Sequence, residues 1–186
     1  LAQEDRRTLN VLIGSSYDKE AVESWRAIKA IGAAVKAIVD AEYDFVRETI
    51  RRLLWSIREE SGCIGWSAPE MLGEIVSADP KRFADITPII ASFHEEENFR
   101  AGVLYALSRI AEVTPEQVQP QRDLVIASLS DRNPLVQAYA LIAIKKARIE
   151  GAETHVQQLV PSTTEVKVFS DDDFVVTSIG TIAADV

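Results

Sequence analysis

The chain has 186 residues, of which 47% are apolar and 26% charged, the composition of one ordinary globular domain. Its formal net charge of −9 argues against a nucleic-acid partner, because binding to a phosphate backbone depends on Lys and Arg side chains that displace counterions. A single cysteine, Cys63, excludes an intrachain disulfide and a cysteine-rich zinc site, and the lack of a leader or of roughly 18 consecutive apolar residues favours a cytoplasmic protein outside the membrane.

The N-terminal part of the chain is predicted to form helical hairpins. A helix over 4–13 ends at a turn that begins with Gly14, and Asp18 is a suitable N-cap for a helix over 18–34. The next helix, over 41–60, places apolar residues at helical spacing on one face. These residues are Phe45, Val46, Ile50, Leu53, Leu54 and Ile57.

Proline-containing start signals mark three of the later helices. The pairs are Asp79-Pro80, Thr114-Pro115 and Asn133-Pro134. Each pair puts an N-cap residue before a proline at the first helical position, where the missing amide costs nothing. The helices expected in this part of the chain cover about 66–77, 80–93, 96–111, 114–129 and 133–149.

The pattern changes after Val160. The run from Glu165 to Phe169 alternates with a period of two residues, three aspartates form a turn, and a second β-rich run begins at Phe174. We expect a β-hairpin followed by a short helix. Residues 161–186 would then cap the last pair of helices, or else form a flexible acidic arm or an interface. The aspartates lack the ligand spacing of an EF-hand loop, so we expect no metal site there.

Four segments of the helical region align with one another. Ala27, Ala68, Val103 and Ala140 are equivalent positions at intervals of 41, 35 and 37 residues, and small or apolar residues recur after each of them. An internal period in this range is typical of stacked helical hairpins, in which neighbouring units share one core. We therefore predict an all-α fold, an α–α superhelix of about four hairpins over residues 1–160 with a short C-terminal β-hairpin.

Two segments carry a resemblance to a known family. They are GCIGWSAPEMLGEI, which begins at Gly62, and NFRAGVLYALSRIA, which begins at Asn98. Over roughly residues 5–150 the chain resembles the HEAT-like repeat group, particularly the short repeats related to phycobilisome-lyase subunits, and it is similar to small bacterial HEAT-repeat proteins. Such repeats serve mostly as scaffolds, so the resemblance implies a binding surface and no particular reaction. Where these repeats commonly have an arginine near the start of the second helix, this chain keeps only Arg100.

Rows of equivalent positions identify a candidate binding surface. In a stack of hairpins the second helices line the concave side, so the side chains of one row become neighbours across it. Aromatic and arginine side chains dominate the binding energy of protein interfaces. The candidate binding residues are Trp25, Arg26, Lys29, Trp66, Glu70, Arg100, Tyr105, Arg109 and Tyr139. The alternative is that Trp25 and Trp66 only pack between neighbouring helices.

The turn from Gly62 to Trp66 is the most unusual local sequence. Its glycines permit close backbone approach, and the free amides before the next helix would suit a small anion, although an ordinary tight turn explains the same residues. No histidine lies near Cys63 in the sequence, which favours a buried thiol over a nucleophile. One His-Glu pair, at His94, is too little for the iron site of HEAT-repeat hydroxylases.

These observations favour a non-enzymatic scaffold that binds a protein or peptide on its concave face, with no cofactor, no metal and no catalytic residue. The alternative is an accessory or lyase-like protein that handles a small cofactor or chromophore in an aromatic groove formed by Trp25, Trp66 and Tyr105. The sequence leaves the identity of the partner and the oligomeric state open.

Overall fold

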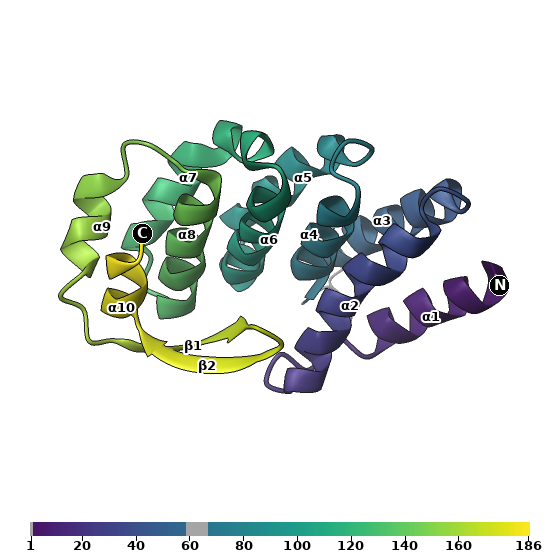
Figure 1. Ribbon diagram of the computed structural model, residues 1–186, viewed down its shortest axis with the longest axis horizontal. Coiled ribbons are helices and arrows are strands. Elements are labelled where there is room, and N and C mark those ends of the chain that lie inside the picture. The colour runs from purple at the N-terminus through teal and green to yellow at the C-terminus, as the bar shows by residue number, and fades with distance from the viewer. Residues whose placement is uncertain (1, 59–66) are drawn as a thin grey trace.

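The computed structural model describes residues 2–58 and 67–186, most of which lie in helices (Figure 1). Four helices form a row in which each one packs against the next in chain order. They are α2 (Val22–Ile38), α4 (Ala68–Ala78), α6 (Arg100–Val113) and α8 (Pro134–Ala147). Further helices pack against this row. They are α1 (Ala2–Gly14), α3 (Tyr43–Arg58), α5 (Thr87–Ser92) and α7 (Arg122–Ala127).

Two of the predicted helices are replaced by shorter pieces. The segment expected to be helical over 80–93 is a 3-10 turn followed by α5 and a second 3-10 turn. The segment over 114–129 is likewise two 3-10 turns, α7 and a third 3-10 turn. The cause is Pro88 in the first case and Pro120 in the second. A proline inside an α-helix removes a backbone hydrogen bond and clashes with the preceding turn, so each α-helix begins close to or after its proline.

The three predicted start signals and the expected cap at Asp18 differ in outcome. Asn133 caps α8 as predicted, since its side chain accepts a hydrogen bond from the Leu135 amide at 2.9 Å. Thr114 makes no side-chain cap bond with the described residues. The prediction for Asp79-Pro80 is wrong: the carboxylate of Asp79 accepts from the amide of Arg82 at 3.1 Å in a turn, and the next helical residue is Ala84. The prediction for Asp18 is wrong: its carboxylate accepts from the amide of Glu20 at 2.9 Å, and α2 begins later, at Val22. Asp18 therefore stabilises the turn before α2 rather than the helix itself.

Small residues let the helices of the row approach closely. A Cβ atom added to Gly73 of α4 would lie 2.5 Å from the Cα atom of Ala106 in α6, so only glycine fits at this contact. Every residue of α4 from Ala68 to Val76 is buried. A helix buried on all sides is part of the core rather than a surface element. The core therefore runs continuously along the row.

The C-terminal residues fold back over the row. Helix α9 (Glu153–Leu159) is followed by the strands β1 (Glu165–Ser170) and β2 (Asp173–Ser178), which pair antiparallel, and then by α10 (Ile179–Ala184). Helix α10 packs against α8 and α9, whereas the hairpin reaches from α8 back to α2, so that its tip lies beside the first helix of the row (Figure 1). We call the surface of the row that the hairpin covers the inner face.

The predicted fold class is confirmed, because the described residues form a helical protein with a two-stranded C-terminal hairpin. None of the helices in the described part of the chain is both long and apolar enough to cross a membrane. The hairpin and the inner face that it covers are the starting point for the functional site.

Candidate functional site

An aromatic cluster joins the inner face to the hairpin. The ring of Trp25 in α2 is stacked on Phe169 of β1, with a centroid distance of 5.4 Å and an interplanar angle of 25°. Phe174 of β2 meets the same indole edge-on at 6.3 Å, and Tyr105 of α6 does so at 5.1 Å. Trp25 is only 4% exposed, and its indole nitrogen donates a hydrogen bond to the carbonyl of Lys19 at 2.9 Å. The hairpin thus fills the aromatic part of the inner face.

Tyr105 of α6 and Tyr139 of α8 anchor this cluster through their hydroxyl groups. Their rings meet edge-on at a centroid distance of 5.4 Å. The Tyr139 hydroxyl accepts a hydrogen bond from the Phe169 amide at 3.3 Å, which links α8 directly to the main chain of β1. The Tyr105 hydroxyl donates to Glu74 at 2.7 Å. Burial, and then the nearby charge of Glu74, raise the pKa of Tyr105 well above its usual range, so this tyrosine remains a hydrogen-bond donor.

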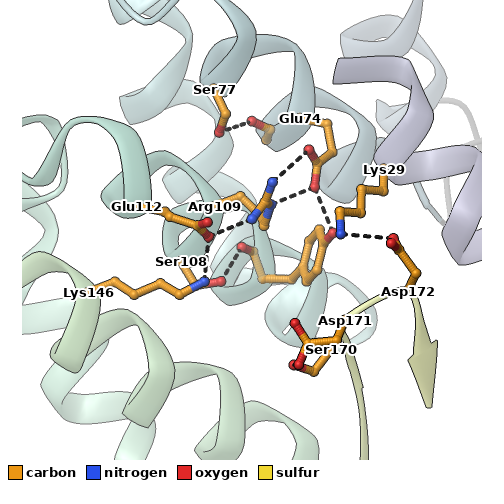
Figure 2. A network of polar contacts seen from close by, with 12 residues as sticks. Lys29, Glu74, Ser77, Ser108, Arg109, Glu112, Lys146, Ser170, Asp171 and Asp172 are labelled. Carbon is orange, nitrogen blue, oxygen red and sulfur yellow. Dashed lines mark hydrogen bonds and ion pairs between the residues drawn. The ribbon is translucent and has the colours of Figure 1, made fainter. Parts of the chain in front are cut away.

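A buried carboxylate, Glu74 of α4, organises the polar part of the site (Figure 2). Arg109 of α6 donates to it at 2.7 Å and also contacts Glu112 on its own helix, while Lys146 of α8 lies 2.6 Å from the same Glu112 oxygen. Burial alone would lower the pKa of Arg109, but the charge of Glu74, the hydrogen bond to Glu74 and the smaller effects of Tyr105 and Glu112 together outweigh burial, and the net shift is upward. Burial opposes ionisation of Glu112 too, yet the hydrogen bond from Lys146 and the charge of Arg109 hold its pKa below the usual range. This chain of charges connects α4, α6 and α8.

A second buried carboxylate, Glu70, lies one helical turn before Glu74. Its Oε1 atom is 2.6 Å from the Lys19 amine, whereas Oε2 makes no hydrogen bond within the part of the chain that the structure describes. A Cβ atom on Gly102 would lie 2.6 Å from either oxygen, so the glycine leaves the space that the carboxylate occupies. Glu70 is therefore a packed, ion-paired residue and not an accessible part of a groove.

Charged side chains hold the tip of the hairpin against α2. The Lys29 amine is 2.8 Å from the Asp172 carboxylate, and the Arg26 guanidinium donates to the Asp172 carbonyl at 2.8 Å. The hydrogen bond from Lys29 holds the pKa of Asp172 below its usual range. Farther along β1, Lys167 pairs with Glu20 at 2.9 Å and lies over the ring of Phe174 at 4.3 Å. Ion pairs between the hairpin and α2 or the turn before it therefore flank the aromatic cluster on both sides.

A cleft of about 620 Å³ lies beside the cluster, between α6, α8, the hairpin and α10. Its apolar wall includes Tyr139, Ile142 and Phe169. The cleft has five basic side chains against three acidic ones, although the whole chain carries a net charge of −9. The basic residues are Lys29, Arg109, Lys145, Lys146 and Arg148. The cleft is therefore a hollow with an aromatic wall and an excess of basic side chains, four of which are held in ion pairs, and it is within the size range of small-molecule sites.

The structure brings together most of the residues that the sequence singles out. Those around the covered inner face are Trp25, Arg26, Lys29, Glu70, Tyr105, Arg109 and Tyr139. Arg100 lies apart from them: it binds Asp131 at 3.0 Å and the His94 carbonyl at 3.2 Å at the start of α6. Trp66 and the turn before it lie outside the described residues.

The aromatic residues that sequence reasoning missed are Phe169 and Phe174. A signal for them exists, because each flanks the acidic turn at a matched position and the two are cross-strand partners in the hairpin. The sequence does not say which surface the hairpin covers. That information lies in tertiary contacts between residues far apart in the chain.

Comparison with family models, with curated proteins and with solved structures gave no match for this chain. Within residues 2–58 and 67–186, no group of three or more His, Cys, Asp or Glu side chains is placed to hold a metal ion. The inner face and its contacts with the hairpin are therefore the features of the molecule that bear on function.

Proposed function

We propose that this protein is a non-enzymatic binding module that holds a segment of a partner protein on the inner face of its helices. The observation that carries the proposal is the stack of Phe169 on Trp25, because it makes the inner face a surface already built to receive an extended segment. The proposal agrees with the scaffold role that the resemblance to HEAT-like repeats implies. Aromatic anchors in buried pockets are the usual centres of binding energy at protein interfaces.

A test uses photo-crosslinking in native lysate, with the crosslinking amino acid placed on the inner face or away from it. Position 26 is suitable because Arg26 is half exposed at the edge of the aromatic cluster, and position 52, an exposed arginine of α3, is the matched control. We expect a defined protein band, crosslinked at position 26 and absent at position 52. Identical products at both positions, or none at position 26, would contradict the proposal.

A second candidate function is the binding of a small anionic molecule, and the cleft between α8 and the hairpin favours it. Five basic side chains and an aromatic wall suit a ligand with a flat apolar body and a carboxylate or phosphate group. The test is a thermal-shift and calorimetry screen of aromatic carboxylates and phosphates. Ile142→Trp, which fills the cleft from its apolar wall, should abolish any binding found, and a ligand that binds this variant unchanged sits elsewhere.

A further inference from the structure

We infer that the C-terminal hairpin is a built-in competitor for the inner face, and that the partner segment shares its chemistry: an extended, acidic segment that carries aromatic side chains. This inference rests on the proposed function and specifies the partner. In the structure the hairpin occupies the place that such a segment would take, so the contacts of the hairpin define what the surface recognises.

The hairpin is attached to the inner face mainly by side chains. Its backbone ladder lies between β1 and β2, where Val168 pairs with Val175 and Phe169 with Phe174. Among the described residues, the hydrogen bonds that link its main chain to the inner face come from side chains, at Tyr139 and Arg26. Releasing the hairpin therefore breaks no shared sheet. Another segment with the same side chains can replace it without rebuilding the helices.

The turn of the hairpin also supplies the charge that meets α2. Asp171 and Asp172 have φ angles of 51° and 66°, the left-handed values that a two-residue hairpin turn requires. Aspartate is one of the few non-glycine residues that tolerate these values, so both aspartates suit the turn. Asp172 in addition pairs with Lys29 across the inner face. The same residue therefore serves the turn and the contact with the inner face.

The charges of the two surfaces are complementary. Residues 151–186 carry six acidic side chains and one basic one, whereas the edge of α2 that the tip meets presents Arg26 and Lys29. These ion pairs are accessible to solvent, because Asp172 is 65% exposed and Lys29 38%. Exposed ion pairs add little to stability but guide which segment associates and in which orientation. An acidic partner meets the same two cations.

The aromatic contacts set the strength of the competition. A two-stranded hairpin is marginally stable by itself, so its ordered state here depends on burying Phe169 and Phe174 against Trp25. When the hairpin of the same chain occupies the surface, the apparent affinity for a partner is the intrinsic affinity multiplied by the fraction of molecules in which the surface is free. Weakening the aromatic contacts of the hairpin must therefore raise the affinity for a partner added in trans.

The test measures binding of a fluorescein-labelled peptide of residues 163–178 to the full chain by fluorescence anisotropy. The wild-type chain should bind it weakly, and the variant Phe169→Ala/Phe174→Ala, whose own hairpin has lost its anchors, should bind it at least 10-fold more tightly. Adding Arg26→Glu/Lys29→Glu to that variant should weaken binding at least 10-fold. Arg51→Glu/Arg52→Glu on α3 is the matched charge control and should leave binding unchanged.

Two further measurements separate the possible causes of failure. If the double alanine variant does not fold by circular dichroism, Phe174→Ala alone is used, because Phe174 is only partly buried. The inference is overturned if the weakened variant binds no more tightly than wild type, or if a peptide with both phenylalanines replaced binds equally well. Loss of peptide binding while the crosslink at position 26 persists would reject this inference and leave the proposed function standing. Peptide binding without any crosslinked partner would reject the proposed function, and with it the partner segment, and would leave only the competition between the hairpin and an added peptide.

Discussion

The two ends of the contact between the hairpin and the inner face use opposite kinds of interaction. In the buried part, Phe169 packs against Trp25 of α2 and its amide donates to Tyr139 of α8. At the tip, Asp172 meets Lys29 in an ion pair that water reaches. The buried end gives stability, while the charged end contributes little stability and much orientation. Substitutions at the two ends should therefore have effects of very different size and different dependence on salt and pH.

The largest effect is expected at the buried end, from Trp25→Ala. Replacing a fully packed tryptophan by alanine costs about 3 to 5 kcal/mol of stability, because both the transfer energy and the packing of the neighbouring rings are lost. Urea denaturation measures the change. Trp55→Ala in α3 is the control, since Trp55 is 64% exposed and its loss should change the free energy of unfolding by less than about 0.5 kcal/mol. Equal effects of the two substitutions would contradict the buried position of Trp25.

The polar network beside the cluster should be nearly as sensitive. Glu74→Leu leaves Arg109 and the Tyr105 hydroxyl without their shared carboxylate, and breaking such a partly buried pair costs about 3 kcal/mol. Adding Arg109→Met should recover part of that loss, because the unpaired charge is then removed as well. The measurement is the free energy of unfolding of the single and double variants. A double variant that is less stable than Glu74→Leu would show that the pair is not the source of the cost.

A smaller loss is expected in the row of helices away from the hairpin. In Gly73→Ala the new methyl group would lie 2.5 Å from the Ala106 Cα atom, and such overpacking costs about 1 to 3 kcal/mol. Gly14→Ala adds a methyl group where no atom of the described residues lies within 4 Å, so the melting temperature of this variant should stay the same or rise. Thermal unfolding of the two variants separates steric cost from the general effect of removing a glycine.

The smallest effect belongs to the charged tip and depends on pH. The hydrogen bond from Lys29 lowers the pKa of Asp172, so the stabilisation is present above the unfolded value near about 3.9 and is lost as the pH falls through the lower folded value. Asp172→Asn should therefore flatten the stability profile between neutral and acid pH and reduce its salt dependence.

The matched control for the tip is Asp171→Asn, whose carboxylate bonds the hydroxyl of Ser170 rather than the inner face. Denaturant unfolding from pH 7 to pH 3, at low and high salt, distinguishes the two variants. Identical pH profiles for both would mean that the contact between Asp172 and Lys29 does not form in solution.

Local features of the structure could be predicted from the sequence, whereas contacts between distant segments could not. The helices and the hairpin follow from local periodicity, and the equivalent positions Ala27, Ala68, Val103 and Ala140 do lie on helices that pack side by side. The helices predicted over 80–93 and 114–129 are shorter in the structure, because Pro88 and Pro120 lie inside apolar patterns that are typical of a helix.

The candidate site was predictable only in part. Trp25, Tyr105 and Tyr139 could be grouped because each lies within two residues of the equivalent positions of the aligned segments, and the structure brings their rings together. Their partner Phe169 belongs to a strand far along the chain, and no periodicity links a strand to a particular helix. Exposed and buried tryptophans also look alike in a sequence, which is why both packing and groove interpretations of Trp25 remained open.

The central claim is that the hairpin rests on the inner face through Trp25, and a double-mutant cycle between Trp25 and Phe169 tests it most directly. The free energies of unfolding of Trp25→Ala, Phe169→Ala and the double variant give the coupling between the two side chains. Stacked aromatic pairs couple by about 0.5 to 1.5 kcal/mol beyond the area they bury, so we predict a favourable coupling of at least about 0.5 kcal/mol. Losses that simply add would contradict the contact and, with it, the hairpin as occupant of the inner face.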